Sequence, residues 1–280
     1  MTSRVASGTV RRRLDTELVR RGLVASRASA LAEIRAGRVL VGGAPAAKAG
    51  TMVDPVQAIE VLGPAPRFVG RGGEKLDAAC EHFHIEVVGR RGLDAGASTG
   101  GFTDCLLQRG ASQVVAVDVG YGQLHERLRA DPRVLVRERT DIRSIGPHDV
   151  GGPVDVVVAD VSFISLRTVL PALAALAAPG AILLALVKPQ FECGRREASR
   201  GRGVVRDPAA WRRALGGVAN ALPASGATMM GAMVSPLTGA EGNVEFFVHA
   251  RTAGADTPVD TAAPDLDAVV AEAVRLHGAG

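Results

Sequence analysis

Short apolar segments alternate with helical stretches along most of this chain. Their length and their content of Val, Ile, Leu and Ala favour strands that are buried on both faces. Seven such segments are predicted, at residues 92–95, 113–118, 134–137, 154–159, 181–187, 227–234 and 244–250. Strands that alternate with helices form an open sheet with ligand sites at the carboxyl ends of its strands. The sequence therefore predicts an α/β domain with a seven-stranded, mostly parallel sheet and helices on both faces.

The amino-terminal quarter has a different pattern. Apolar residues between Arg13 and Ala36 fit two short helices separated at Gly22, with Ser26 as the N-cap of the second. Two strands follow, in "GRVLVGG" and "DPVQAIEVLG". The stretch "GPAPRFVG" then has the composition of a linker. We predict a small α+β module at residues 1–62, a linker at 63–70, the large domain at 71–250, and a second linker with a final helix at 251–280.

Composition excludes several classes of protein. The 280 residues are 47% hydrophobic, which is enough for one large core and a small module. No apolar run reaches the roughly 18–20 residues of a membrane span, and no apolar segment follows the first arginines as in a secretory signal. Three widely spaced cysteines (Cys80, Cys105 and Cys193) fit neither a disulfide framework nor a zinc site. We expect a cytoplasmic protein with reduced cysteines, no metal and no membrane partner.

Positive charge is concentrated near the amino terminus. Residues 1–75 contain 13 Lys and Arg against 6 Asp and Glu, whereas residues 76–250 contain 18 of each and residues 251–280 contain 2 against 5. A basic module beside a neutral domain favours attraction to a polyanion such as RNA. The alternative is a basic surface that serves only solubility.

A glycine-rich turn follows the first strand of the large domain. In "GLDAGASTGGFTDC", Gly96, Gly100 and Gly101 separate that strand from a helix that starts near Phe102. Such a turn lets a ligand approach the backbone and the helix amino terminus. The spacing differs from dinucleotide and P-loop motifs, which disfavours NAD and ATP. Asp118, at the end of the next strand, can accept both hydroxyls of a ribose. A structural turn is the alternative, and Asp118 and Asp141 could instead cap helices.

This arrangement resembles the Rossmann-like class I methyltransferases. The resemblance implies S-adenosylmethionine as cofactor, with its methionine moiety beside the glycine turn, its ribose at Asp118 and its adenine beside Asp141 and Ile142. The residues that it assigns to the cofactor are Asp94, Gly96, Ala97, Ser98, Thr99, Gly100, Phe102, Asp118, Val119, Asp141, Ile142 and Asp160.

Lys188 is placed unusually in "LLALVKPQF". It directly follows a run of buried aliphatic residues and precedes Pro189, and a charge at such a position is costly unless it is paired or functional. Asp160 ends the fourth strand, and Glu245 is predicted on the seventh, so both should reach the same crevice as Lys188. Lys75 lies in the helix that opens the domain. Asp160 as a helix cap and Glu245 as a partner of a surface arginine are the alternatives.

The set Lys75, Asp160, Lys188 and Glu245 resembles the catalytic residues of FtsJ/RrmJ-type ribose 2′-O-methyltransferases. The resemblance implies methyl transfer to a ribose 2′-hydroxyl. That hydroxyl has a pKa far above neutral, so its proton must leave as the new bond forms. Lys188 is either a base, if it becomes neutral, or a cation that orients the hydroxyl and stabilises negative charge.

The amino-terminal module, "RRRLDTELVRRGLVASRASALAEIRAGRVLVGGAPAAK", resembles the S4 RNA-binding domain. With "RGGEKL", "DVSFISL" and "LVKPQFE", the chain from about Arg11 to Ala250 resembles the TlyA (hemolysin A) family. The resemblance implies a monomeric methyltransferase of cytidines in 16S and 23S rRNA of the 30S and 50S subunits, whose loss confers resistance to capreomycin-type antibiotics. The alternatives are a membrane-active hemolysin and an inactive RNA-binding assembly factor.

RNA contacts are predicted at basic residues of both domains. The arginine-rich segment "GRREASRGRGVVRD" is interpreted as a loop that grips phosphates, with a solvated loop as the alternative. The complete predicted set is Arg11, Arg12, Arg13, Arg20, Arg27, Lys48, Arg71, Arg195, Arg196, Arg200 and Arg202.

Overall fold

The computed structural model describes residues 11–24, 26–63, 66–193, 203–239, 241–254 and 263–278. It divides the chain into two compact units, Met1–Gly70 and Arg71–Gly280. The following paragraphs describe each unit by itself.

The first unit contains the two predicted helices, α1 (Leu14–Arg20) and α2 (Arg27–Arg35). Ser26 caps α2 as predicted, since its side chain accepts a hydrogen bond from the Ser29 backbone N–H. The helices share a core with the strands, and its buried members are Leu14, Leu18, Val24, Ala30, Ile34, Val39, Val53 and Ile59. The strands are β1 (Arg12–Arg13), β2 (Val39–Val41), β3 (Ala44–Pro45), β4 (Met52–Val53) and β5 (Ile59–Val61). They form one sheet in the order β3-β2-β5 and a separate β1-β4 pair.

The second unit contains the predicted seven-stranded sheet. Its strands lie in the order β11-β12-β10-β9-β6-β7-β8. Five neighbouring strands, β10, β9, β6, β7 and β8, are parallel, while β12 is antiparallel to both of its neighbours. The strands are β6 (Arg91–Ala95), β7 (Gln113–Val117), β8 (Val134–Arg137), β9 (Val154–Ala159), β10 (Ala177–Val187), β11 (Ala227–Val234) and β12 (Phe246–Thr252).

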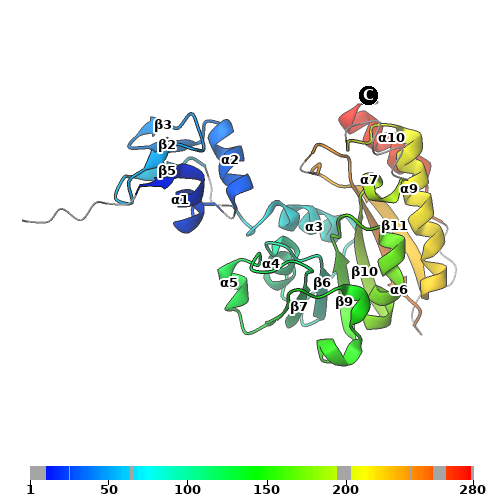
Figure 1. The fold of residues 1–280 in the computed structure, drawn as a ribbon. Helices are drawn as coiled ribbons and strands as arrows, with labels where there is room; N and C mark the ends of the chain where they lie inside the picture. The colour runs from blue at the N-terminus through cyan, green and yellow to red at the C-terminus, as the bar shows by residue number, and fades with distance from the viewer. Residues whose placement is uncertain are drawn as a thin grey trace, which may run out of the picture. The chain divides into compact units, whose positions relative to one another are not determined.

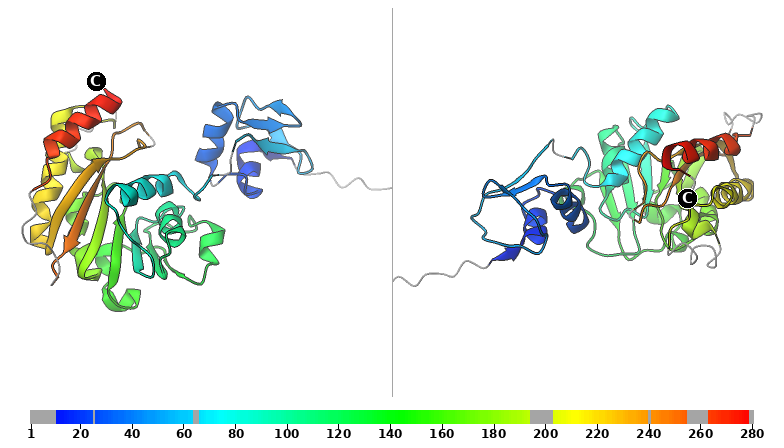
Figure 2. Two further views of the ribbon diagram at one scale, coloured as in Figure 1. Left: turned by 180° about the vertical axis from the view of Figure 1, so that it is seen from behind. Right: turned by 90° about the horizontal axis from the view of Figure 1, so that it is seen from above.

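Helices cover both faces of this sheet (Figures 1 and 2). The helices α3 (Arg71–His82) and α4 (Gly101–Gln108) lie on one face, and α6 (Leu166–Leu176), α9 (Pro208–Ala221) and α10 (Leu266–His277) lie on the other. Each turns an apolar side to the sheet; Leu173 and Trp211, for example, are fully buried in the core. The short elements are α5 (Glu126–Arg129), α7 (Pro189–Glu192) and the 3₁₀ turns η1 (Ile142–Ser144), η2 (Pro147–Val150) and η3 (Pro223–Ser225). This arrangement confirms the predicted fold class.

Two strands differ from their predicted limits by more than one residue. Strand β10 begins at Ala177, where one residue pairs with Val154 before a register shift. Strand β12 begins at Phe246, so Glu245 precedes the strand on which it was predicted to lie. The reason is that the preceding segment bonds elsewhere: the Asn243 side chain accepts from Val205 N and donates to Gly203 O. The strand also continues to Thr252, two residues into the predicted second linker.

The structure describes all three cysteines, and no disulfide joins them. Burial raises the pKa of Cys80 to about 11. Within the described residues, no helix combines the length and the apolarity that a membrane crossing requires.

Candidate functional site

The glycine turn between β6 and α4 adopts a conformation that suits glycine. Gly96 and Gly100 have φ angles of 87° and 95°, in the left-handed region. A Cβ atom on Gly96 would lie 2.5 Å from the carbonyl oxygen of Asp160, and one on Gly100 would collide with the Leu128 side chain. The turn therefore packs closely against the end of β9 and against α5 only because both positions lack side chains.

A pocket of about 630 Å³ lies at the carboxyl ends of β6, β7 and β9. Seven of the predicted cofactor residues line it: Gly96, Ser98, Asp118, Val119, Asp141, Ile142 and Asp160. Ala97, Thr99 and Phe102 line a smaller cavity of about 120 Å³ that shares Gly96, Ser98 and Asp160 with the larger one. The remaining two, Asp94 and Gly100, line neither cavity.

Asp118 joins two loops at the edge of this pocket. Its two carboxylate oxygens accept hydrogen bonds from the Ser98 and Gly120 backbone N–H groups, at 2.8 and 2.6 Å. It caps no helix. Asp141, in contrast, caps η1 by accepting from the Arg143 N–H, so the capping alternative is correct for this residue. The Arg143 guanidinium also lowers the pKa of Asp141 to about 2, and the carboxylate stays ionised at the pocket wall.

Asp94 is completely buried beneath the glycine turn. Its Oδ2 atom accepts hydrogen bonds from the backbone N–H and the hydroxyl of Thr103, at 2.9 and 2.7 Å, which ties β6 to α4. Its Oδ1 atom has no hydrogen-bond partner. Burial raises the pKa of Asp94 to about 7, and the neighbouring charge of Asp160 acts in the same direction. A cation nearby would stabilise the ionised form.

Lys188 leaves β10 and faces the end of β9. Its Nζ atom lies 2.5 Å from Asp160 Oδ1 and donates a hydrogen bond of 2.8 Å to the Ser162 hydroxyl. The Lys188 side chain is 11% exposed, so its charge is paired where the chain emerges from the core. Asp160 is therefore an ion-pair partner, and the helix-cap alternative is wrong for it.

Lys75 and Glu245 form a second, more deeply buried pair. The Lys75 Nζ atom donates to Glu245 Oε2 at 2.5 Å, and the two side chains are only 9% and 3% exposed. Glu245 consequently pairs with a buried lysine and not with a surface arginine. Burial raises the pKa of Glu245, whereas the charges of Lys75 and Lys188 lower it. The charges of Lys188 and Asp160 also act on Glu245, so the structure brings the four predicted catalytic side chains together. They come from α3, from the residues directly after β9 and β10, and from the segment before β12.

Glu192 fixes the two loops that carry this site, and sequence analysis did not identify it. Its buried carboxylate accepts from the Ser165 hydroxyl at 2.6 Å and from the Leu166 backbone N–H at 2.5 Å. The loop after β9 is thereby attached to the chain that follows Lys188. A glutamate four residues after the lysine was the available signal, but its partners are more than 20 residues away.

Ser162 and Phe163 were also missed, although both occur in the quoted segment "DVSFISL". Phe163 lines the large pocket, yet 91% of it is exposed. Its φ of 65° is rare for a residue with a side chain, and its ring lies 5.2 Å from that of Phe191. Unfavourable backbone conformations of this kind cluster at functional sites.

The predicted RNA-binding residues are exposed wherever they are described. In the first unit these are Arg11, Arg12, Arg13, Arg20, Arg27 and Lys48. Arg71 is exposed at the start of α3 in the second unit. Arg195, Arg196, Arg200 and Arg202, with most of the predicted phosphate-gripping loop, lie outside the described residues.

Comparison with known proteins defines the class. Residues 68–252 match the family of FtsJ-like methyltransferases, and residues 12–58 match the S4 domain. The protein is therefore a methyltransferase of the FtsJ-like class, with an S4 domain that precedes the methyltransferase domain in the sequence. Over 243 residues it is 53% identical to the 16S/23S rRNA (cytidine-2'-O)-methyltransferase TlyA of Mycobacterium tuberculosis, covering 86% of this chain and 90% of that protein. The chain belongs to the TlyA family.

Two further relatives agree with this assignment. The 23S rRNA (cytidine-2'-O)-methyltransferase TlyA of Campylobacter jejuni is 36% identical over 182 residues, which are 65% of this chain and 70% of that protein. The solved structure of a candidate hemolysin from Streptococcus thermophilus superposes with a TM-score of 0.74 at 37% identity and covers 96% of this chain and 97% of that one.

Proposed function

We propose that this protein transfers a methyl group from S-adenosylmethionine to the 2′-hydroxyl of cytidine riboses in ribosomal RNA. The observation that carries the proposal is the pairing of Lys188 with Asp160 and of Lys75 with Glu245 at the end of the parallel strands, with Asp160 also lining the pocket. The name of the Mycobacterium tuberculosis relative supplies the substrate class.

The residues of the pocket fit this cofactor. A volume of about 630 Å³ lies within the roughly 300–1,000 Å³ of small-molecule sites. Each carboxylate oxygen of Asp118 accepts one backbone hydrogen bond and keeps a lone pair for a ribose hydroxyl. Asp118 and Asp160 line the pocket and Asp94 lies beneath its glycine turn, and carboxyl groups at these places favour a positively charged ligand such as a sulfonium. When bound, S-adenosylmethionine supplies a methyl group that is activated by the positive sulfur.

We assign Lys188 to the cationic role. The Asp160 Oδ1 atom lies 2.5 Å from Lys188 Nζ, and such an ion pair is the contact of a lysine that acts as a cation. An ammonium group has three N–H donors, of which one donates to the Ser162 hydroxyl, while Asp160 is an ion-pair partner. A donor is left for the substrate 2′-oxygen, which it orients and whose negative charge it stabilises as the proton leaves. Glu245 is close enough for the charge of Lys188 to act on it, since that charge lowers the pKa of Glu245 against the effect of burial.

Phe163 is assigned to the target base. An exposed aromatic ring at the rim of a cofactor pocket offers a stacking surface, and RNA-modifying proteins commonly hold unstacked bases against such rings. Phe163 directly follows Ser162, which accepts a hydrogen bond from Lys188, and its ring contacts that of Phe191, three residues after Lys188. We propose that a base stacked on Phe163 places its ribose within reach of Lys188.

Mapping the methyl marks tests the proposed function. In the cell, we expect the protein to act as a monomer in the cytoplasm. Purified protein that is incubated with the cofactor and with 30S and 50S subunits should add 2′-O-methyl groups to cytidines of both. The 16S/23S relative is 53% identical to this chain and the 23S relative from Campylobacter jejuni is 36% identical, which favours both subunits over the large one alone. Subunit binding without methyl transfer would instead identify an assembly factor, and leakage of lipid vesicles would support a membrane-active protein.

Asp94 predicts a pH dependence of cofactor affinity. Its folded-state pKa of about 7 lies above the usual value near 4, so its neutral form stabilises the fold at low pH. This stabilisation is lost as the pH rises through 7. A bound cation favours the carboxylate, and we therefore expect affinity for S-adenosylmethionine to increase between about pH 6 and 8.

Calorimetric titration of both ligand forms checks this prediction. S-adenosylhomocysteine lacks the sulfonium charge, so its affinity should change much less over the same pH range. Asp94→Asn keeps an oxygen for Thr103 but cannot ionise, and it should remove the difference between the two ligands. Parallel pH curves for the two ligands in the unaltered protein would contradict the role of Asp94.

A further inference from the structure

Two carboxylates are buried beneath the exposed arginines of the first unit. Asp15 is 4% exposed and Glu17 is fully buried, although both lie on the short helix α1. Acidic residues are almost never buried to this extent unless they are paired. Each of the two is paired with more than one arginine.

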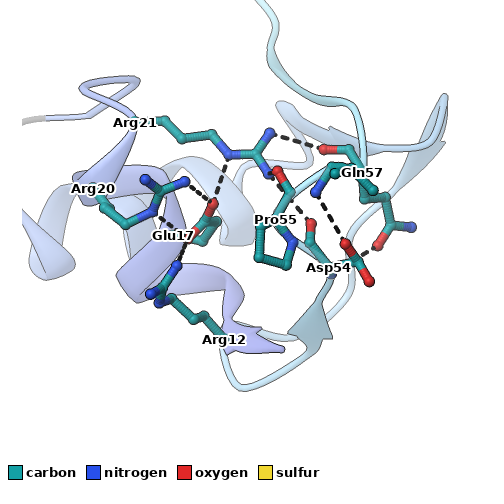
Figure 3. A network of polar contacts seen from close by, with 8 residues as sticks. Arg12, Glu17, Arg20, Arg21, Asp54, Pro55 and Gln57 are labelled. Carbon is teal, nitrogen blue, oxygen red and sulfur yellow. Dashed lines mark hydrogen bonds and ion pairs between the residues drawn. The ribbon is translucent and has the colours of Figure 1, made fainter. Parts of the chain in front are cut away.

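Glu17 holds three arginines (Figure 3). Its Oε1 atom accepts from Arg20 Nη2 at 2.6 Å and from Arg21 Nε at 2.8 Å, and its Oε2 atom accepts from Arg20 Nε at 2.8 Å. Arg12 Nη1 lies 3.9 Å from Oε2. The Arg20 and Arg21 guanidiniums lower the pKa of Glu17 to about 2, so the carboxylate is ionised at physiological pH.

Asp15 holds two further arginines. Its carboxylate accepts from Nε and Nη2 of Arg13, at 3.1 and 2.9 Å, and from Nη2 of Arg27, at 2.9 Å. Arg13 and Arg27 belong to different elements, since one precedes α1 and the other begins α2. Asp15 therefore fixes two guanidinium groups that local structure alone would not bring together.

The donors that remain free differ between these arginines. A guanidinium has five N–H donors. Arg21 directs its Nη atoms to the carbonyl oxygens of Asp54, Pro55 and Gln57, so it anchors a loop and is only 21% exposed (Figure 3). Among the described residues of this unit, Arg20 and Arg13 bond to their carboxylates through the Nε and Nη2 edge. Their Nη1 groups and the largely exposed guanidiniums of Arg12 and Arg27 have donors left for a ligand.

We propose that Asp15 and Glu17 are positioning residues for RNA binding, which hold Arg12, Arg13, Arg20 and Arg27 in place for contacts with backbone phosphates. The inference rests on the proposed function, because it takes RNA as the substrate. Guanidinium groups that are already ordered lose less side-chain entropy when they bind phosphate. The five arginines outnumber the two carboxylates, so the cluster keeps a positive charge.

For variants of Asp15 and Glu17, this inference predicts a change in RNA affinity opposite to the one that net charge alone predicts. Replacing either acid by its amide makes the protein more positive by one charge, which by itself would strengthen RNA binding. If the acids position the arginines, Glu17→Gln and Asp15→Asn should instead weaken it, by about tenfold for the loss of one charge-assisted contact. The slope of log affinity against log salt should also become shallower by about one, because fewer phosphates are neutralised.

Binding of the full-length protein to unmethylated ribosomal subunits, without cofactor and at several salt concentrations, tests the proposal. Glu60→Gln is the matched control, since Glu60 is an exposed acid of the same unit and its variant has the same charge change. Arg21→Gln controls for stability, because it should lower the unfolding temperature through the lost loop contacts without a shallower salt slope. The expected result is weaker binding by both acid variants than by Glu60→Gln.

The outcomes separate the inference from the proposed function. If the unaltered protein binds subunits and both acid variants bind as tightly as Glu60→Gln, the positioning role is wrong while the proposed function stands. The positioning role is also wrong if an acid variant binds more weakly but keeps the salt slope of the unaltered protein, because a merely destabilised protein would behave in this way. If the unaltered protein itself does not bind ribosomal subunits, the proposed function fails first.

Discussion

Replacing Lys188 by alanine is expected to reduce methyl transfer by about 10²–10⁴-fold, the range seen when a positioned proton-transfer or charge-stabilising group is removed. The affinity for S-adenosylmethionine should change by no more than a few-fold, because Lys188 is not among the residues that line the larger pocket. Single-turnover transfer from labelled cofactor and calorimetric titration measure the two effects separately. Unaltered turnover in Lys188→Ala would remove the lysine from the reaction.

Ser162→Ala is the control for this variant. It removes the 2.8 Å hydrogen bond to Lys188 Nζ but leaves the ion pair with Asp160. We expect a loss of about tenfold, since one hydrogen bond that orients a charged group contributes roughly 1.5 kcal/mol. The pH profile of the unaltered enzyme separates the two roles of Lys188: a cation gives a rate that is flat from about pH 7 to 9, and a neutral base gives a rate that increases throughout this range.

Removing one member of the buried Lys75–Glu245 pair is expected to lower the free energy of unfolding by about 3–5 kcal/mol. The reason is that the remaining charge would stay in a site where the two side chains are 9% and 3% exposed. Lys75→Met and Glu245→Leu should both show this loss in denaturant unfolding of the protein. Both should also lose most of their methyl-transfer activity.

The double variant distinguishes stability from function. Lys75→Met with Glu245→Leu replaces the ion pair by apolar groups of similar size, which often restores the stability that either single change removes. We expect stability to return to within about 1–2 kcal/mol of the unaltered protein while activity remains low. A stable double variant with full activity would show that the pair only supports the fold. A double variant as unstable as the single ones would show that apolar groups cannot replace the pair.

Local patterns predicted much of the fold because secondary structure depends on near neighbours. The runs of aliphatic residues located the strands, and Gly96 and Gly100 marked the turn whose left-handed angles the structure shows. Ser26 was identified as a cap from its position alone. In the same way Lys188 was selected because a charge directly after buried aliphatic residues needs a partner.

The bonding partner of a side chain could be predicted where that partner is close in the sequence. Asp141 caps η1 and pairs with Arg143, two residues away, so its capping role was visible as an alternative. The arginines of the first unit were chosen for their charge, whereas the burial of Asp15 and Glu17 beneath them was not foreseen. Burial of an acid on an arginine-rich helix depends on side chains from another helix and from a loop, which no short pattern contains.

The amino-acid sequence by itself determined the order of the strands and helices, the glycine turn and the types of residue that reach the carboxyl ends of the strands. Only the tertiary structure decided which of those residues meet. Lys75 pairs with Glu245 across 170 positions, and Glu192 connects the loops after β9 and β10. The physical reason is that these contacts depend on the lateral order of the strands, with β12 antiparallel between β10 and β11, and on helix packing. Neither is encoded in the spacing of neighbouring residues.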